Sequence, residues 1–295
     1  MSKYLFIQAE KANHSVRALC RVLQVAVSAF YAWASRTPSA REREDERLRV
    51  HIRAIHKASR ATYGSPRVHA ELRGLGLKVS RKRVIRLLRE LGLEANRPKK
   101  WKQTTLSDPS AKAAPNLLER DFTADAPNEV WTSDLTYVWT SEGWLYLVVI
   151  LDLFSRRVVG WAADRHMRTE LVLEALEGAV RRRRPSNGLI LHTDRGSQFT
   201  SHDFQKFLSD NGFKSSMSKR GDCFDNAPTE SFFATYKNEL IYRRSWPTRR
   251  DALAATADFI DRRYNTQRLH STLGYRTPAE FELEYHRQQR MIAAA

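Results

Sequence analysis

The chain has 295 residues, of which 42% are hydrophobic, a length that suits two domains or one domain with a large appendage. Its net charge of +17 and its pI near 10.2 predict a polyanionic partner, and most of the excess positive charge lies before residue 129. Two cysteines exclude a disulfide framework and a cysteine-based zinc motif. The longest apolar run is too short to cross a bilayer and no signal peptide is recognisable, so we expect a cytoplasmic protein with no membrane partner.

Residues 1–93 are predicted to form a helical DNA-binding region with two helix-turn-helix-like units. In the first unit, apolar residues at helical spacing begin at Val16, and Ser28 is expected to cap a second short helix that runs to Trp33. This second helix carries aromatic side chains rather than polar side chains that read bases. A small helical hairpin with no DNA contact therefore explains the first unit equally well.

The second unit follows a charged helix expected over 41–57 and contains two helices, the first of which ends at Gly74 and Gly76. Ser80 is expected to cap the second helix. Its predicted DNA contacts are basic residues at its start or away from its apolar stripe: Arg81, Lys82, Arg83 and Arg86. Arginines in such places can meet phosphates and guanine edges, while a solvated basic face with no DNA contact is the alternative.

Residues 94–128 show no clear periodicity and are predicted to be a basic linker. The segment 97–102 combines basic residues with Trp101, a composition that fits a path along a phosphate backbone. An ordinary unstructured connection explains the same composition.

Residues 129–245 are predicted to form an α/β catalytic core, followed by a helical C-terminal extension over 246–295. The expected strands are 130–138, 144–151, 157–163, 189–192 and 214–217, and the expected helices are 169–184, 202–211 and 226–240. Short connections between the first three strands imply an antiparallel meander, and the later alternation with helices implies parallel additions covered on both faces. This mixed five-stranded sheet has the element order of a ribonuclease H-like fold.

Three acidic residues fall where this fold would bring them together. Asp134 lies among small β-branched neighbours in the strand-like run VWTSDLTYV, Asp194 ends a short apolar strand, and Glu230 lies one turn inside a helix expected from Asp225 or Asn226. A carboxylate on a buried central strand needs a partner such as a cation. Oxygen-only ligands suit Mg²⁺ or Mn²⁺ rather than zinc, and two such ions can promote an in-line phosphoryl displacement. The sequence therefore predicts a catalytic metal site at these three acids.

Other polar residues near the predicted site receive separate interpretations. Lys237 lies seven residues after Glu230, about two turns along the same helix face, and is predicted to reach a DNA phosphate. Asp225 is interpreted as a helix cap. His192 and Asp152 are interpreted as structural hydrogen-bonding residues, although His192 could support the site and Asp152 could be a fourth acid.

Several segments together resemble the DDE transposases of the retroviral-integrase type: VWTSDLTYV, WLYLVVILDLFSRRVVGW, LHTDRGSQFTS, GDCFDNAPTESFFATYKNEL and YNTQRLHSTLGYRTPAEFE. More closely, the chain resembles the second-frame product (OrfB) of the insertion-sequence-three family of bacterial mobile elements, and the likeness includes the N-terminal segments. The pattern is specific because 35 residues separate Asp194 from Glu230 and Lys237 follows seven residues later. The resemblance implies a ribonuclease H-like core with Asp134, Asp194 and Glu230 as metal ligands.

The resemblance also implies what the protein acts on. It implies cleavage of double-stranded DNA at the terminal repeats of a mobile element and joining of the freed 3′ ends to target DNA, with Mg²⁺, or Mn²⁺ as a substitute, at two ions per site. We expect a homo-oligomer on DNA, because two element ends must be brought together, and the upstream-frame (OrfA) product as a partner. Two alternatives are a DNA-binding regulator with a vestigial acidic site and a nuclease that hydrolyses DNA without joining it.

Overall fold

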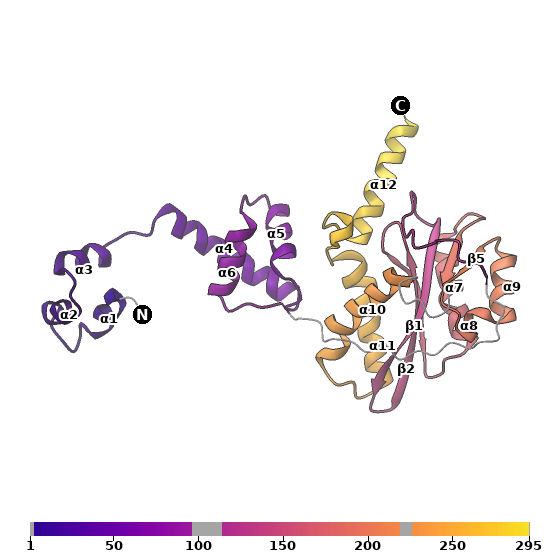
Figure 1. Cartoon of the computed structure of the whole chain (residues 1–295), viewed down its shortest axis with the longest axis horizontal. Coiled ribbons are helices and arrows are strands. Elements are labelled where there is room, and N and C mark those ends of the chain that lie inside the picture. Colours follow the sequence, from indigo (N-terminus) through magenta and orange to yellow (C-terminus); the bar gives the residue numbers. More distant parts are fainter. Residues whose placement is uncertain (1–2, 96–113, 219–225, 295) are drawn as a thin grey trace.

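The structure is a computed structural model that describes residues 3–95, 114–218 and 226–294. Two helical units precede an α/β unit, and the long C-terminal helix projects away from it (Figure 1). The basic segment 97–102 and Asp225, for which the sequence predicted roles, lie outside the described residues, as does Asp222. Within the described ranges, no helix is both long enough and apolar enough to span a membrane.

The first helical unit contains α1 (Lys3–Glu10), α2 (Val16–Val22) and α3 (Val27–Ala34). Its buried core is Ile7, Leu19, Cys20 and Phe30. The expected cap at Ser28 is wrong, because α3 begins at Val27 after Ala26, and Val27 packs against this core. Helix α1 was not expected from the sequence. Its Ile7 is buried in the core that the three helices share.

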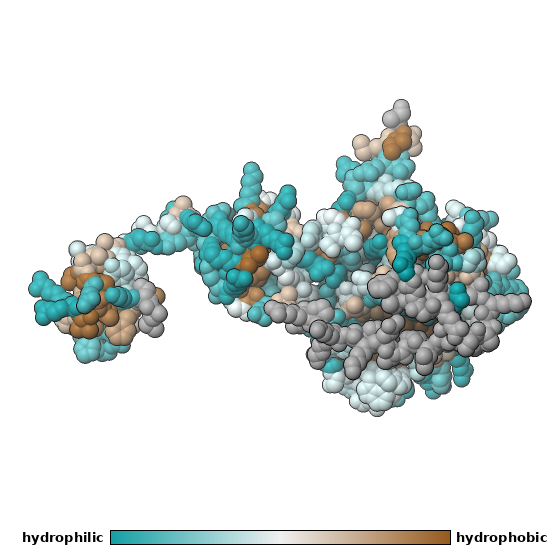
Figure 2. Space-filling view, viewed as in Figure 1, coloured by the Kyte–Doolittle hydropathy of each residue, from teal (hydrophilic) through white to brown (hydrophobic). Residues whose placement is uncertain are grey.

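The second helical unit contains α4 (Ala40–Ala58), α5 (Ser65–Gly74) and α6 (Arg81–Glu90). Hydrophilic side chains cover most of this unit in Figure 2. The expected cap at Ser80 is confirmed, because its Oγ accepts a hydrogen bond from the amide of Arg83. Apolar residues of all three helices meet in one core, which is Leu48, Ile52, Tyr63, Val68, Leu72, Val84, Leu87 and Leu88.

Buried hydrogen bonds fasten the second unit to the C-terminal part of the chain. The buried Arg263 donates through Nη2 to the carbonyl of Ser59 at 2.6 Å and to Oγ1 of Thr62 at 2.9 Å. Tyr63 accepts from the amide of Leu269 at 2.8 Å. Because the donors and acceptors are buried, separating the two surfaces would leave polar groups without partners.

The α/β unit contains a five-stranded sheet in the order β3-β2-β1-β4-β5. The strands are β1 (Val130–Thr140), β2 (Gly143–Asp152), β3 (Val158–Asp164), β4 (Ile190–Thr193) and β5 (Lys214–Met217). The first three strands pair antiparallel, whereas β4 pairs parallel with both β1 and β5. This is the expected mixed sheet of a ribonuclease H-like fold, and each expected strand lies within two residues of an observed one.

Helices cover both faces of the sheet. One face packs against α7 (Thr169–Arg183), α8 (Ser197–Thr200) and α9 (His202–Asp210), through a core that includes Trp131, Val148 and Leu176. The other face packs against α10 (Ala227–Glu239), α11 (Arg249–Ala257) and the π-helical η3 (Asp258–Tyr264). Shorter turns η2 (Ile241–Arg243) and η4 (Ser271–Leu273) connect these elements to the terminal α12 (Pro278–Ala293). Helices therefore enclose the central strand β1, on which Asp134 lies.

Candidate active site

Two of the predicted acids, Asp134 and Asp194, are brought together by neighbouring parallel strands. Thr132 on β1 pairs with His192 on β4, an offset of 60 residues. The same offset connects Asp134 with Asp194, and each lies two residues beyond this last paired position. Because parallel strands run in the same direction, both carboxylates emerge at the same end of the strand pair. The expectation that they share one end of the sheet is confirmed.

Helix α10 is tied to β1 next to the first acid. The hydroxyls of Thr132 and Thr229 share a hydrogen bond of 2.6 Å, and Asn226 Nδ2 donates to the carbonyl of Ser133 at 3.2 Å. Because Thr229 directly precedes Glu230, this tie places Glu230 beside the strand that carries Asp134. The sequence analysis did not identify this connection.

The apolar side of α10 lies in the core of the α/β unit. Phe232, Phe233, Tyr236 and Leu240 are buried, and the Tyr236 hydroxyl meets Oγ1 of Thr256 at 2.7 Å. Glu230 itself is exposed. The helix is therefore held by its apolar arc while the acid remains open to a ligand.

The three acids influence each other electrostatically. Burial, together with the negative charges of Asp194 and Glu230, raises the pKa of Asp134 to about 8, while the amide of Leu135 and the charge of Lys237 oppose the shift. Burial also raises the pKa of Asp194 and the pKa of Glu230. Negative charge next to the buried Asp134 is unfavourable, and a bound cation would offset it.

The donor chemistry fits a hard divalent cation. Asp134 Oδ1 accepts from the amide of Leu135 at 2.7 Å, and Asp194 Oδ1 accepts from the amide of Gly196 at 3.0 Å. These bonds orient the carboxylates, and all the candidate ligands are oxygens. In the described ranges no three His, Cys, Asp or Glu side chains are already gathered into a group that could enclose an ion.

Lys237 interacts electrostatically with Asp134. The residue is buried, and its Nζ lies 5.3 Å from the centroid of the Tyr137 ring. Burial lowers the pKa of Lys237, and the charge of Asp134 acts in the opposite direction. Its ammonium group therefore connects the acids to the exposed aromatic side of the β1–β2 hairpin. Its contact with a DNA phosphate remains a prediction.

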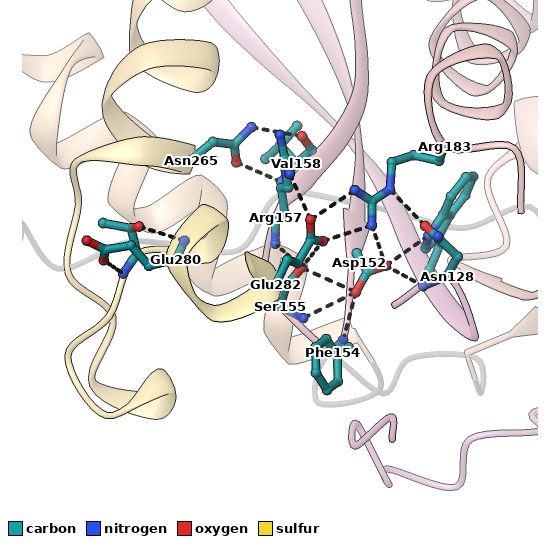
Figure 3. A network of polar contacts seen from close by, with 12 residues as sticks. Asn128, Asp152, Phe154, Ser155, Arg157, Val158, Arg183, Asn265, Glu280 and Glu282 are labelled. Carbon is teal, nitrogen blue, oxygen red and sulfur yellow. Dashed lines mark hydrogen bonds and ion pairs between the residues drawn. The ribbon is translucent and has the colours of Figure 1, made fainter. Parts of the chain in front are cut away.

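Asp152 and His192 have the structural roles that we expected. Asp152 Oδ2 accepts from the amide of Asn128 at 2.7 Å and from the Trp131 ring nitrogen at 3.2 Å. Figure 3 shows this carboxylate beside Arg183, in a network that also includes Glu282 of α12. The ring nitrogens of His192 lie 2.8 Å from Ser216 Oγ and 3.2 Å from Ser218 Oγ, which ties β4 to β5 and the segment that follows it.

The predicted DNA contacts on α6 fall into two groups. Arg81 and Lys82 are exposed at the start of the helix. Arg83 and Arg86 instead pair with the buried Asp45 of α4, with nitrogen–oxygen distances of 2.7 Å for both. The sequence analysis did not identify Asp45, because a charged residue in a charged helix gives no sign of burial.

Comparisons with known proteins agree with this architecture. Residues 124–223 and 211–278 match two models of the integrase core domain, and residues 42–101 match an HTH-like domain. A 31 kDa protein of insertion element IS600 from Shigella sonnei is 43% identical over 91% of this chain and 98% of its own length. The InsF transposase of insertion sequence IS3A from Escherichia coli is 39% identical over 95% of this chain and 98% of its own.

Among solved structures, the catalytic core of HTLV-2 integrase in complex with magnesium is similar to part of this chain. It is 20% identical, covers 54% of this chain and 99% of its own, and has a TM-score of 0.42.

Proposed function

Because this chain belongs to the IS3 family of insertion-sequence transposases, we propose that Asp134, Asp194 and Glu230 are the carboxylates with which it cuts and joins DNA. The protein is a transposase, an enzyme of the polynucleotidyl transferase type, with an integrase core and an HTH-like domain. The observation that carries the residue assignment is the placement of the three acids: Asp134 and Asp194 each lie two residues beyond the last pair of the parallel strands β1 and β4, and the hydrogen bond between Thr132 and Thr229 holds α10, with Glu230, against β1. A cation from solution would offset the negative charge gathered there.

We propose Mg²⁺ as that cation, with Mn²⁺ as a substitute and two ions per site, on the basis of the oxygen donors. When bound, the ions activate the attacking oxygen and stabilise the leaving oxygen of a phosphodiester. Asp134 and Asp194 hold fixed positions because backbone amides orient one oxygen of each. Exposed Glu230 completes the set from the side on which DNA can approach.

Lys237 acts on the same phosphate in this proposal. Its buried ammonium lies beside Asp134 and offsets part of the negative charge of the acids. A cation in that place also attracts the phosphate that is to be attacked. We therefore assign Lys237 a positioning role rather than a role in proton transfer.

DNA recognition away from the active site is assigned to the second helical unit. Arg81 and Lys82 lie exposed at the start of α6, where they can meet phosphates or base edges. Arg83 and Arg86 can add to the local positive potential, although their guanidinium groups already pair with acids. We further propose a homo-oligomer on double-stranded DNA, the upstream-frame product as a partner, and action in the cytoplasm.

A strand-transfer assay tests the residue assignment. Labelled DNA ends of the source element are incubated with wild type, Glu230→Gln or Glu170→Gln, in Mg²⁺, Mn²⁺ or EDTA. Glu170 is a matched control because it is an exposed helical acid on α7, which packs on the face of the sheet opposite α10. We expect joined products that require metal, disappear in Glu230→Gln and persist in Glu170→Gln.

Other results would contradict the proposal in different ways. Joined products made by Glu230→Gln would remove Glu230 from the site. Nicks without joining would indicate a nuclease. DNA binding without chemistry would indicate a regulator, unless fusion to the upstream frame restores joining.

A further inference from the structure

Three aromatic side chains lie exposed together on the hairpin formed by β1 and β2. Tyr137, Trp139 and Trp144 are 40%, 59% and 41% exposed, and we call these three residues the aromatic platform. The hairpin projects at the lower end of the α/β unit in Figure 1. Single exposed aromatics are common in proteins, but large side chains that are exposed as a contiguous group mark a binding surface.

The platform is preformed by the pairing of the two strands. Trp139 lies directly opposite Trp144 in the register, with ring centroids 4.7 Å apart and an interplanar angle of 72°. Tyr137 lies two residues before Trp139 on the same face of β1, and its ring centroid is 4.9 Å from that of Trp144. The rings therefore support each other edge to face, and a ligand would meet surfaces that are already oriented.

The tip of the hairpin is fastened to the chain that follows α10. The amide of Ser141 donates to the carbonyl of Trp246 at 2.9 Å, and Arg249 Nε donates to the carbonyl of Trp144 at 2.9 Å. The backbone at Gly143 has a φ of +103°, and a Cβ there would lie 2.8 Å from Nη2 of Arg249. These contacts hold the platform at a fixed position relative to the sheet.

The platform and the candidate active site meet at Lys237, although Tyr137 and Asp134 point to opposite faces of β1. Lys237 Nζ lies over the ring of Tyr137, and the same ammonium acts on the charge of Asp134. On the other side, the segment that supports the tip carries the exposed basic residues Arg243, Arg244 and Arg250. Glu142 at the tip reduces this charge locally, and its carboxylate accepts from the amide of Arg249 at 2.8 Å. The surroundings thus attract a polyanion while the platform offers flat apolar faces.

This combination identifies the ligand by its chemistry. In a paired duplex the faces of the bases are covered by stacking, so an aromatic surface has access only to bases that have left the stack. Stacking on Trp or Tyr tolerates any base, and cations beside the rings hold the accompanying phosphates. If the platform bound a second copy of this protein through apolar contacts, basic residues around it would not be needed.

We propose that the aromatic platform binds unpaired bases of the DNA strand next to the phosphate in the active site. Trp139 and Trp144 stack on the bases, and Lys237 lies between this strand and the acids. The proposal rests on the function assigned above, since the DNA end is what places an unpaired strand there. It makes the platform a positioning surface, with no part in the bond-breaking step.

Binding in EDTA tests the proposal without requiring any chemistry. The probe is a fluorescent duplex of the element end with a short unpaired extension, compared with the same duplex in which the extension carries abasic sugars. For the full chain, we expect Trp139→Ala with Trp144→Ala to weaken binding of the base-containing probe by about fivefold to a hundredfold or more, fivefold to a hundredfold being the range for losing one stacked base. Binding of the abasic probe should change less than about twofold, since phosphate contacts carry it.

Two controls separate stacking from other effects. Trp139→Phe keeps a flat ring and should retain most of the base-dependent binding, whereas Trp139→Leu keeps apolar area without a flat face and should lose it. Leu253→Ala, at an exposed apolar residue of nearby α11, should bind both probes as wild type does. Circular dichroism checks that each variant folds, which we expect because the truncated side chains are largely exposed.

Equal losses on both probes, or no loss on either, would overturn the proposal. A change in oligomeric state at unchanged DNA binding would also overturn it, by identifying the platform as a protein interface. Base-dependent binding that persists while Glu230→Gln still joins strands would mean that the platform is real and the catalytic assignment is wrong. The two proposals can therefore fail separately.

Discussion

Two charged helices of this transposase, α6 and α10, use their charges in opposite ways. On α6, Arg83 and Arg86 both donate to the carboxylate of Asp45, so opposite charges satisfy each other inside the protein. On α10, Glu230 lies beside Asp134, so like charges are held together. The difference shows that opposite charges paired inside the protein stabilise its fold, whereas a group of like charges needs a ligand of opposite charge from outside.

The pKa values express the same contrast. Burial alone would raise the pKa of Asp45, but hydrogen bonds from Arg86 and Arg83 outweigh burial and lower it. Burial also raises the pKa of Asp134, and there the charges of Asp194 and Glu230 add to the shift, to about 8, instead of cancelling it. The hydrogen bonds of Asp45 thus satisfy its charge within the protein, whereas the surroundings of Asp134 favour a cation from outside.

The largest expected effect is on chemistry at the acids. Asp194→Asn should reduce strand transfer about a thousandfold or more, because a lost metal ligand removes several kcal/mol of transition-state stabilisation. The same variant should leave the metal-free protein at least as stable as wild type at pH 7, since one repelling carboxylate is gone. Gel assays and urea unfolding measure the two effects, and Asp203→Asn, at an exposed acid of α9, is the control. If Asp194→Asn lowered the unfolding free energy as much as it lowered transition-state stabilisation, the contrast between α6 and α10 would be wrong.

The next largest effect is on the second helical unit. Asp45→Ala leaves Arg83 without its buried partner and should destabilise the unit by about 3 kcal/mol. Glu46→Ala on the same helix, which removes an exposed pair with Arg49, should cost less than about 1 kcal/mol. Hydrogen exchange of the α6 amides measures both changes. Equal exchange in the two variants would show that Asp45 contributes no more than a surface acid.

A smaller effect concerns the buried His270, where the second unit meets the C-terminal segment. Burial, with the nearby charges of Arg268 and Arg67, lowers the pKa of His270 to about 3, so the folded protein keeps this ring neutral. The unfolded chain binds the proton near pH 6.5, so the stability from this group is full above pH 6.5 and falls as the pH drops toward 3. Between pH 6.5 and 4.5 the loss should be about 2 to 3 kcal/mol.

Comparison of wild type with His270→Gln isolates this contribution. The variant should show a shallower fall in unfolding free energy between pH 6.5 and 4.5, because glutamine takes up no proton. Urea titrations at three pH values measure the difference. Parallel pH profiles for the two proteins would refute the assignment.

The smallest expected effect distinguishes the two groups of basic residues on α6. Replacing Arg81 and Lys82 by alanine should lower the slope of log affinity against log salt for duplex DNA by about 1 per residue, since each releases counterions from a phosphate. Arg86→Ala should change that slope less, because its guanidinium is shared with Asp45 and Glu90. Anisotropy titrations at several salt concentrations measure the slopes, and the reverse order would assign Arg86 to the DNA.

Much of the catalytic unit could be predicted from the sequence. Alternation along VWTSDLTYV places Asp134 on a strand, and the apolar arc of Phe232, Phe233 and Tyr236 gives the orientation of α10. Such patterns are local, because the period of a helix or strand requires only neighbours along the chain. The first helical unit was predicted less well, since α1 lacks a strong periodic pattern and the start of α3 depends on packing against it.

The sequence alone determined the family, the order of strands and helices, and the three acids with their spacing. The tertiary structure decided which side chains from distant segments meet: Asp45 with Arg83, Thr132 with Thr229, and Lys237 with both Asp134 and the ring of Tyr137. The physical reason is that a pattern of residues records which side chains avoid water, whereas a pairing depends on the distance between atoms far apart in the chain. That distance exists only once the helices have packed against the sheet.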